Sequence, residues 1–146
     1  MQKLKTRKGS LIIEGVVSLF IISLLIFSSF EIYTTSYKIN SENKAKDNYI
    51  NILDAVTKEI IYNKDYHFIE GLQANKRLYI PPNYINISTI KNRDINELFT
   101  AEVPDICPYI SINIENGDIY KIKLSLHYKK NNGIGDIHSD LYKGKY

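Results

Sequence analysis

The side chains that most often perform catalysis or bind metals are few in this chain, and they lie far apart in the sequence. The 146 residues include one cysteine, Cys107, and three histidines, which are His67, His127 and His138. A single cysteine excludes an internal disulfide framework and any cysteine-rich zinc module. The histidines lack the spacing of a helical zinc motif, and no nucleophile elbow, phosphate-binding loop or EF-hand calcium loop is present. The sequence therefore predicts a protein that is not an enzyme and that uses no metal ion or other cofactor.

One acidic residue stands in a setting that needs a chemical explanation. Glu14 is the only charged residue between Leu11 and Phe30, where the chain reads LIIEGVVSLFIISLLIFSSF. A helix of this length spans roughly 30 Å, which is the thickness of the hydrocarbon core of a bilayer. A carboxylate near the centre of a membrane costs about 2.5–3.5 kcal/mol, and one nearer the end of the span still calls for a partner. The run predicts a single membrane-spanning helix over residues 11–30.

The charges on either side of this run predict its orientation. Lys3, Lys5, Arg7 and Lys8 lie before it, whereas Glu31 follows it directly. Because basic residues stay on the cytoplasmic side, we expect a cytoplasmic N-terminus and an extracytoplasmic C-terminal region. Removing those four of the 19 basic residues leaves 15 against 16 acidic ones, so the rest of the chain is close to neutral. Nucleic acid binding through bulk charge is therefore not expected.

Three interpretations of the N-terminal region compete, of which two follow from the residues and the third rests on a family resemblance. A secretory signal peptide has an apolar core of about 7–15 residues followed by a small-residue cleavage site, and this run is longer and has no such site. An uncleaved membrane anchor explains the length, the apolarity and the basic residues, but it does not explain Glu14. The third interpretation, a processed and assembled subunit, explains all of these features together.

The third interpretation depends on the stretch Lys8-Gly9-Ser10-Leu11-Ile12-Ile13-Glu14, which resembles the class III signal of type IV pilins and pseudopilins. In that family a short basic leader ends in Gly, a membrane peptidase cuts after the Gly, and the fifth mature residue is Glu. The resemblance covers residues 7–32 and implies cleavage between Gly9 and Ser10, which leaves 137 residues of the 146. It also implies N-methylation of the new terminus, although Ser10 replaces the usual Phe. Glu31 stands where many major pilins have a helix-kinking Pro.

The resemblance further implies a role for Glu14 and a set of partners. Cleavage creates an ammonium group on Ser10, and the Glu14 carboxylate of a neighbouring subunit would pair with it, because such a pair strengthens in low dielectric. The implied partners are a prepilin peptidase, membrane lipid, other pilin or pseudopilin subunits and, indirectly, an assembly platform and its ATPase. The implied function is that of a minor pilin or pseudopilin in a type IV pilus, type II secretion or competence filament, which resides first in the cell membrane and then outside the cell. The alternative is an uncleaved, single-pass anchored binding module.

The remaining hydrophobic periodicity predicts an α+β fold. Residues 10–62 are expected to form one long helix, in which a polar and exposed or frayed stretch at 41–48 separates the apolar run from an apolar stripe. The stripe consists of Ile50, Leu53, Val56, Ile60 and Ile61. We expect this second half of the helix to pack on a small antiparallel sheet formed within residues 63–146.

The strand pattern is strongest near the C-terminus. Residues 109–115 and 118–128 alternate apolar and polar side chains, and Asn116-Gly117 between them predicts a type I′ hairpin turn. The alternation places Tyr120 and Tyr128 on the face opposite Lys121 and Lys123. Because the aromatic and basic side chains do not share a face, we do not expect a strip for single-stranded nucleic acid.

The other segments have weaker signals. Residues 63–90 are expected to be irregular, with short strands at 78–80 and 84–90, and residues 95–99 are expected to form a helical turn. Residues 129–146 contain few apolar side chains and are expected to form a loose tail. We expect Cys107 to be buried in packing and His127 to lie at the surface.

Overall fold

The computed structural model describes residues 3–130 and 133–144, with side chains from residue 11 onward. The elements along the chain are α1 (Lys3–Asn63), α2 (Tyr66–Ala74), β1 (Tyr79–Ile80), the 3-10 helix η1 (Pro82–Tyr84), α3 (Ile87–Asn92), α4 (Ile95–Leu98), β2 (Tyr109–Glu115), β3 (Ile119–Lys130) and β4 (Gly133–Gly144). The predicted α+β class is confirmed, and the chain divides into two compact units, Met1–Lys44 and Ala45–Tyr146.

The first unit consists of the N-terminal part of α1. The helix begins at Lys3, earlier than the predicted start at residue 10, and so it includes the basic N-terminal segment. No glycine or proline occurs between Val16 and Glu70, so nothing in the backbone chemistry interrupts the helix. The polar stretch 41–48 is fully exposed and remains helical throughout. Of the two states predicted for residues 41–48, the exposed helix is therefore correct and the frayed helix is wrong.

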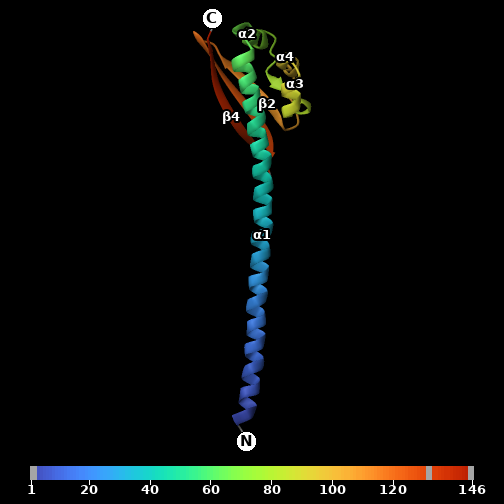
Figure 1. Cartoon of the computed structure of the whole chain (residues 1–146), viewed down its shortest axis with the longest axis vertical. Coiled ribbons are helices and arrows are strands. Elements are labelled where there is room, and N and C mark those ends of the chain that lie inside the picture. The colour runs from blue at the N-terminus through green and yellow to red at the C-terminus, as the bar shows by residue number, and fades with distance from the viewer. Residues whose placement is uncertain (1–2, 131–132, 145–146) are drawn as a thin grey trace. The chain divides into compact units, whose positions relative to one another are not determined.

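The second unit contains a four-stranded antiparallel sheet in the order β1-β2-β3-β4. The alternation in β2 and β3 places their apolar side chains on one face, where Ile112 lies opposite Leu124. The C-terminal part of α1 runs along the sheet in Figure 1. It and the three shorter α-helices contribute buried residues to the same core. Tyr120 is buried on this face, as the predicted separation of tyrosines and lysines requires. Its hydroxyl donates a hydrogen bond to Glu70 Oε1 over 3.1 Å.

The apolar stripe of α1 is rotated relative to the prediction. Ile52 is 1% exposed and shares the buried face with Leu53, Val56 and Ile60, whereas Ile50 is 43% exposed and Ile61 is 37% exposed. Successive helical residues are separated by about 100° around the axis, so residues 52, 53, 56 and 60 fall within one sector. Ile50 and Ile61 lie about 100° or more from its centre, which explains their exposure.

The connection between β2 and β3 differs from the predicted turn. The last pair is Glu115 with Lys121, so five residues form the connection instead of two. Gly117 does not have the positive φ that a type I′ turn requires. A two-residue turn at Asn116-Gly117 would place Lys121 opposite Ile112 and move the lysines to the apolar face. Burial of the isoleucines and leucines therefore decides the register, and the type I′ prediction is wrong.

The expected loose tail at 129–146 is also wrong, because β4 is a twelve-residue strand that pairs with β3 along its whole length. Only Leu141 of this strand is fully buried, so its own hydrophobic pattern is weak. β4 is held in the sheet mainly by its backbone hydrogen bonds to β3, which do not depend on apolar side chains.

The predicted irregular region contains helices. Asp65 caps the N-terminus of α2 by accepting a hydrogen bond from the Phe68 amide over 3.0 Å, and α2 buries Ile69 and Leu72. The strand expected at 84–90 is wrong, because this segment contains the end of η1 and the start of α3. The short strand at 78–80 and the helical turn at 95–99 are confirmed as β1 and α4.

Candidate functional site

The residues predicted for processing and assembly lie in the first turns of α1. Gly9 and Ser10 are helical in backbone, and their side chains are outside the described part of the structure. Glu14 lies one turn beyond Ser10 and its side chain is exposed. Among the side chains of residues 11–130 and 133–144, none forms a hydrogen bond or ion pair with the Glu14 carboxylate.

The apolar segment that follows Glu14 satisfies its own hydroxyl groups. Each serine between Leu11 and Phe30 donates its hydroxyl to the carbonyl oxygen four residues earlier over 2.7–2.9 Å, namely Ser18 to Glu14, Ser23 to Leu19, Ser28 to Leu24 and Ser29 to Leu25. A hydroxyl bonded in this way needs neither water nor a second chain. The segment can therefore enter an apolar medium with Glu14 as its only unsatisfied polar side chain.

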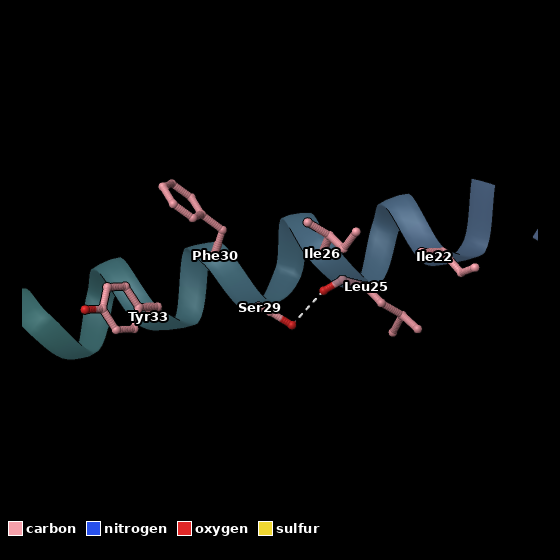
Figure 2. Close-up of a pocket in the computed structure, with 6 residues that line it drawn as sticks. All are labelled: Ile22, Leu25, Ile26, Ser29, Phe30 and Tyr33. Carbon is pink, nitrogen blue, oxygen red and sulfur yellow. Dashed lines mark hydrogen bonds between the residues drawn. The ribbon is translucent and has the colours of Figure 1, made fainter. Parts of the chain in front are cut away.

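The same segment exposes its apolar side chains. Those between Leu11 and Phe30 are 50–71% exposed, and none is covered by another part of the described chain. Figure 2 shows one part of this surface, where the Ser29 hydroxyl points back to the Leu25 carbonyl. The residues of this stripe recur at spacings of three and four, and they are Ile22, Leu25, Ile26, Ser29, Phe30 and Tyr33. Such a stripe fits lipid tails or the apolar face of another helix.

Gly15 follows the acidic residue directly and lies in open space. A Cβ built at this position has no atom within 4 Å. The fold of a single chain therefore does not require glycine here. A small residue beside Glu14 leaves room for a second helix to approach the backbone closely.

Comparison with protein-family models, curated proteins and solved structures found no match to this chain. The geometry itself supports a coarser statement. The described residues contain one helix that is long and apolar enough to cross a membrane, and it lies near the N-terminus.

The other residues considered from the sequence are separate from one another. Cys107 is a free thiol and is half-buried, so it is less enclosed than predicted. His67 is exposed and its Nδ1 lies 3.5 Å from Glu70 Oε2. Within residues 3–130 and 133–144, no group of three or more His, Cys, Asp or Glu side chains is arranged to hold a metal ion.

His127 is not the simple surface residue that the sequence predicted. Its side chain is 21% exposed, its Nε2 lies 2.9 Å from Ser111 Oγ, and its Nδ1 lies 2.6 Å from Asp136 Oδ1. The Tyr109 ring lies 4.5 Å from the imidazole, centroid to centroid. The polar alternation of β2 and β3 already places Ser111 and His127 on one face, but Asp136 joins them only because β4 exists.

Among the ionisable groups of the second unit, Tyr109 and Asp94 have pKa values that are shifted by clear causes. Burial, followed by the nearby Cys107 thiol and the Asp136 carboxylate, raises the pKa of Tyr109. Asp94 accepts a hydrogen bond from Lys64 Nζ over 2.7 Å and another from the Asn96 amide over 3.0 Å, and these bonds lower the pKa of its carboxyl. Neither group belongs to the N-terminal segment.

Proposed function

We propose that this chain is a pilin-like structural subunit, either a minor pilin or a pseudopilin. A prepilin peptidase removes the leader between Gly9 and Ser10, and the processed chain assembles into a filament of the type IV pilus, type II secretion or competence kind. The observation that carries this proposal is Glu14, which lies five residues beyond Gly9 at the head of an otherwise apolar, exposed segment and has no partner among the described side chains. This role requires no catalysis by the chain itself.

The surface of the N-terminal helix supports assembly. Each large apolar side chain contributes about 1.5–3 kcal/mol when it moves from water to a fully buried site. One face of α1 between Ile52 and Ile60 is already buried in the core, whereas the apolar side chains between Leu11 and Phe30 have no cover within the described part of the chain. Lipid would cover these side chains before assembly, and the equivalent helices of other subunits would cover them afterwards.

The proposed location follows from the same features. The subunit first resides in the cell membrane as a single-pass protein, with its leader in the cytoplasm and residues 45–146 outside. An assembly platform and its ATPase then extract it into an extracellular filament. The contacts with the assembly platform and the N-methylation of Ser10 are proposed because of the family resemblance.

A mass measurement tests the processing step. The full chain is co-expressed with a prepilin peptidase, purified in detergent and measured by intact mass spectrometry. We expect the loss of Met1–Gly9, with a further methyl group on the fraction that is N-methylated. Gly9→Ala is expected to abolish the loss.

A chain that keeps its leader under these conditions would support the alternative, an uncleaved anchored binding module. The matched control is Gly15→Ala, which changes another glycine of the same helix at a position with open space around it. It should be cleaved like the wild type.

A further inference from the structure

The outer face of the sheet carries a polar network that assembly does not use. Three neighbouring strands contribute one residue each: Ser111 from β2, His127 from β3 and Asp136 from β4. The Cα atoms of His127 and Asp136 are directly paired across the strands. On the other side His127 is paired with Tyr109 of β2, and Ser111 lies two pairs further along that strand. All three side chains lie opposite the apolar core, which receives the buried residues of the helices.

The distances within this network place a hydroxyl, an imidazole and a carboxylate in series. Asp136 Oδ1 lies 2.6 Å from His127 Nδ1, and His127 Nε2 lies 2.9 Å from Ser111 Oγ. The tautomer with its proton on Nδ1 satisfies both contacts, because Nδ1 then donates to the carboxylate and Nε2 accepts the serine proton. A base-activated serine nucleophile needs this order of groups at these distances.

We propose that Ser111 is an activated serine that accepts acyl groups from activated esters. Ser111 Oγ attacks the ester carbonyl carbon while His127 Nε2 takes the hydroxyl proton, and Asp136 stabilises the resulting imidazolium. The ester C–O bond breaks, and the proton passes from Nε2 to the departing phenolate or alkoxide. Attack by water on the acyl-serine, with His127 again as the base, releases the acid and restores Ser111. No oxidant or metal takes part.

The surroundings of Ser111 limit the substrate class. The residue is half-buried on a strand in the middle of a sheet face, and the ring of Tyr109 lies against its partner His127. The Tyr109 ring on this face can contact a flat or aromatic group of the substrate. Because the site is open, the substrate needs a leaving group that departs readily without further stabilisation by the protein. Aryl esters of short acids fit these conditions, and turnover should be slow because an oxyanion is stabilised best in an enclosed site.

The same face provides an internal control. Ser125 Oγ lies 2.9 Å from His138 Nδ1, which makes a second serine–histidine pair of similar length. Among the described residues, no carboxylate is bonded to the other nitrogen of His138. The two serine–histidine pairs differ because only His127 has a carboxylate partner. Comparing the labelling rates of Ser111 and Ser125 therefore tests the effect of all three residues together, and not merely the exposure of a serine.

The experiment uses the full chain in detergent, treated with a fluorophosphonate probe and, separately, with p-nitrophenyl acetate. We expect covalent labelling at Ser111 by peptide mass spectrometry and release of p-nitrophenol, both lost in Ser111→Ala. His127→Gln should lower the labelling rate by roughly 100-fold, within the range of general base catalysis. Ser125→Ala and His138→Gln should label at the wild-type rate.

Asp136 acts through His127, so its test needs a separate readout. Asp136→Asn should slow labelling, because the imidazolium that forms loses its anionic partner, and Asp136→Glu, which keeps a carboxylate, should recover part of the wild-type rate. Equal labelling of Ser111 and Ser125, or no labelling of Ser111 in a protein with wild-type circular dichroism, would overturn the proposal. Neither outcome bears on leader cleavage, so this site and the filament role are tested independently.

Discussion

At the residue scale, the central contrast is between two acids on the same helix. Glu14 lies within the apolar segment, whereas Glu31 lies directly after it, and both side chains are exposed. Only Glu14 would enter a low-dielectric region together with a neighbouring ammonium group. Removing one partner of a buried ion pair costs about 3–5 kcal/mol, because the remaining charge is left without compensation.

We therefore expect Glu14→Ala to reduce filament yield by more than tenfold, while leader cleavage proceeds normally. The yield is measured in the sheared surface fraction of cells that assemble the filament, and cleavage is measured by intact mass. Glu31→Ala is the matched control and should assemble like the wild type. Normal assembly of Glu14→Ala would rule out the pairing role.

Asp94 gives a residue-scale prediction for pH. Its pKa is lowered, first by the hydrogen bond from Lys64 and then by the amide of Asn96, so the unfolded chain binds a proton more readily than the folded one. This contribution to stability is present above the ordinary value of 3.8 and is lost as the pH falls through the lower folded value. Asp94→Asn should therefore flatten the acid side of the curve of unfolding free energy against pH, measured by urea denaturation at several pH values. Parallel wild-type and variant curves below pH 4 would contradict this account.

At the element scale, β4 connects the sheet to the end of α1. Lys143 Nζ donates to the carbonyl oxygens of Ile60 and Ile61 over 3.3 and 2.7 Å, and α1 has no basic residue of its own in its last turn. The final carbonyl groups of a helix have no partners within it, so a cation there satisfies them and interacts favourably with the helix dipole. On the same side, Thr57 donates to Ser139 Oγ over 3.1 Å.

Lys143→Met keeps the aliphatic part of the side chain and removes the donors. We expect it to lower the free energy of unfolding by about 1 kcal/mol, because a charged cap on two carbonyl groups is lost. Thermal and urea denaturation followed by circular dichroism measure the effect. Lys123→Met, on the exposed face of β3, is the control and should change stability by less than about 0.5 kcal/mol.

A substitution of Leu141 tests whether the C-terminal segment is a packed strand or a loose tail. Leu141 is 3% exposed in β4 and belongs to the hydrophobic core. Leu141→Ala should destabilise the protein by about 2–5 kcal/mol, as expected for a buried leucine, whereas a residue in a loose tail would have almost no effect. Urea denaturation decides between these outcomes, and Ile134→Ala, at an exposed position of the same strand, is the matched control.

At the scale of the whole molecule, the hydrophobic core and the apolar segment at residues 11–30 consist of different residues. Every residue of the core cluster lies between Ile52 and Leu141, within the unit Ala45–Tyr146. None of the described residues before Ala45 belongs to this core. The stability of the sheet and the membrane affinity of the chain should therefore be separable by truncation.

A fragment of residues 45–146 should fold as a soluble monomer, whereas the full chain should require detergent or lipid. Circular dichroism with a cooperative thermal transition and sedimentation velocity measure the two properties. A fragment that is unfolded, or that aggregates as the full chain does, would show that the first unit supports the fold.

The sequence by itself determined the features that depend on local periodicity. The apolar run with Glu14, the long helix, the strands β2 and β3 and their buried face are all readable from spacings of two, three and four residues. The helix α2 was also accessible in principle through the Asp65 cap, but its short apolar pattern gave no clear signal.

Only the tertiary structure decided the features that depend on pairing between distant segments. Gly133–Gly144 becomes a strand because β3 offers a full row of backbone partners, and the five-residue connection replaces the Asn-Gly turn because burial of Ile112 and Ile114 fixes the register. The contacts of His127 with Ser111 and Asp136 arise from that register and from β4 together. Hydrogen bonds between strands do not depend on side-chain identity, so such contacts leave little trace in the order of residues.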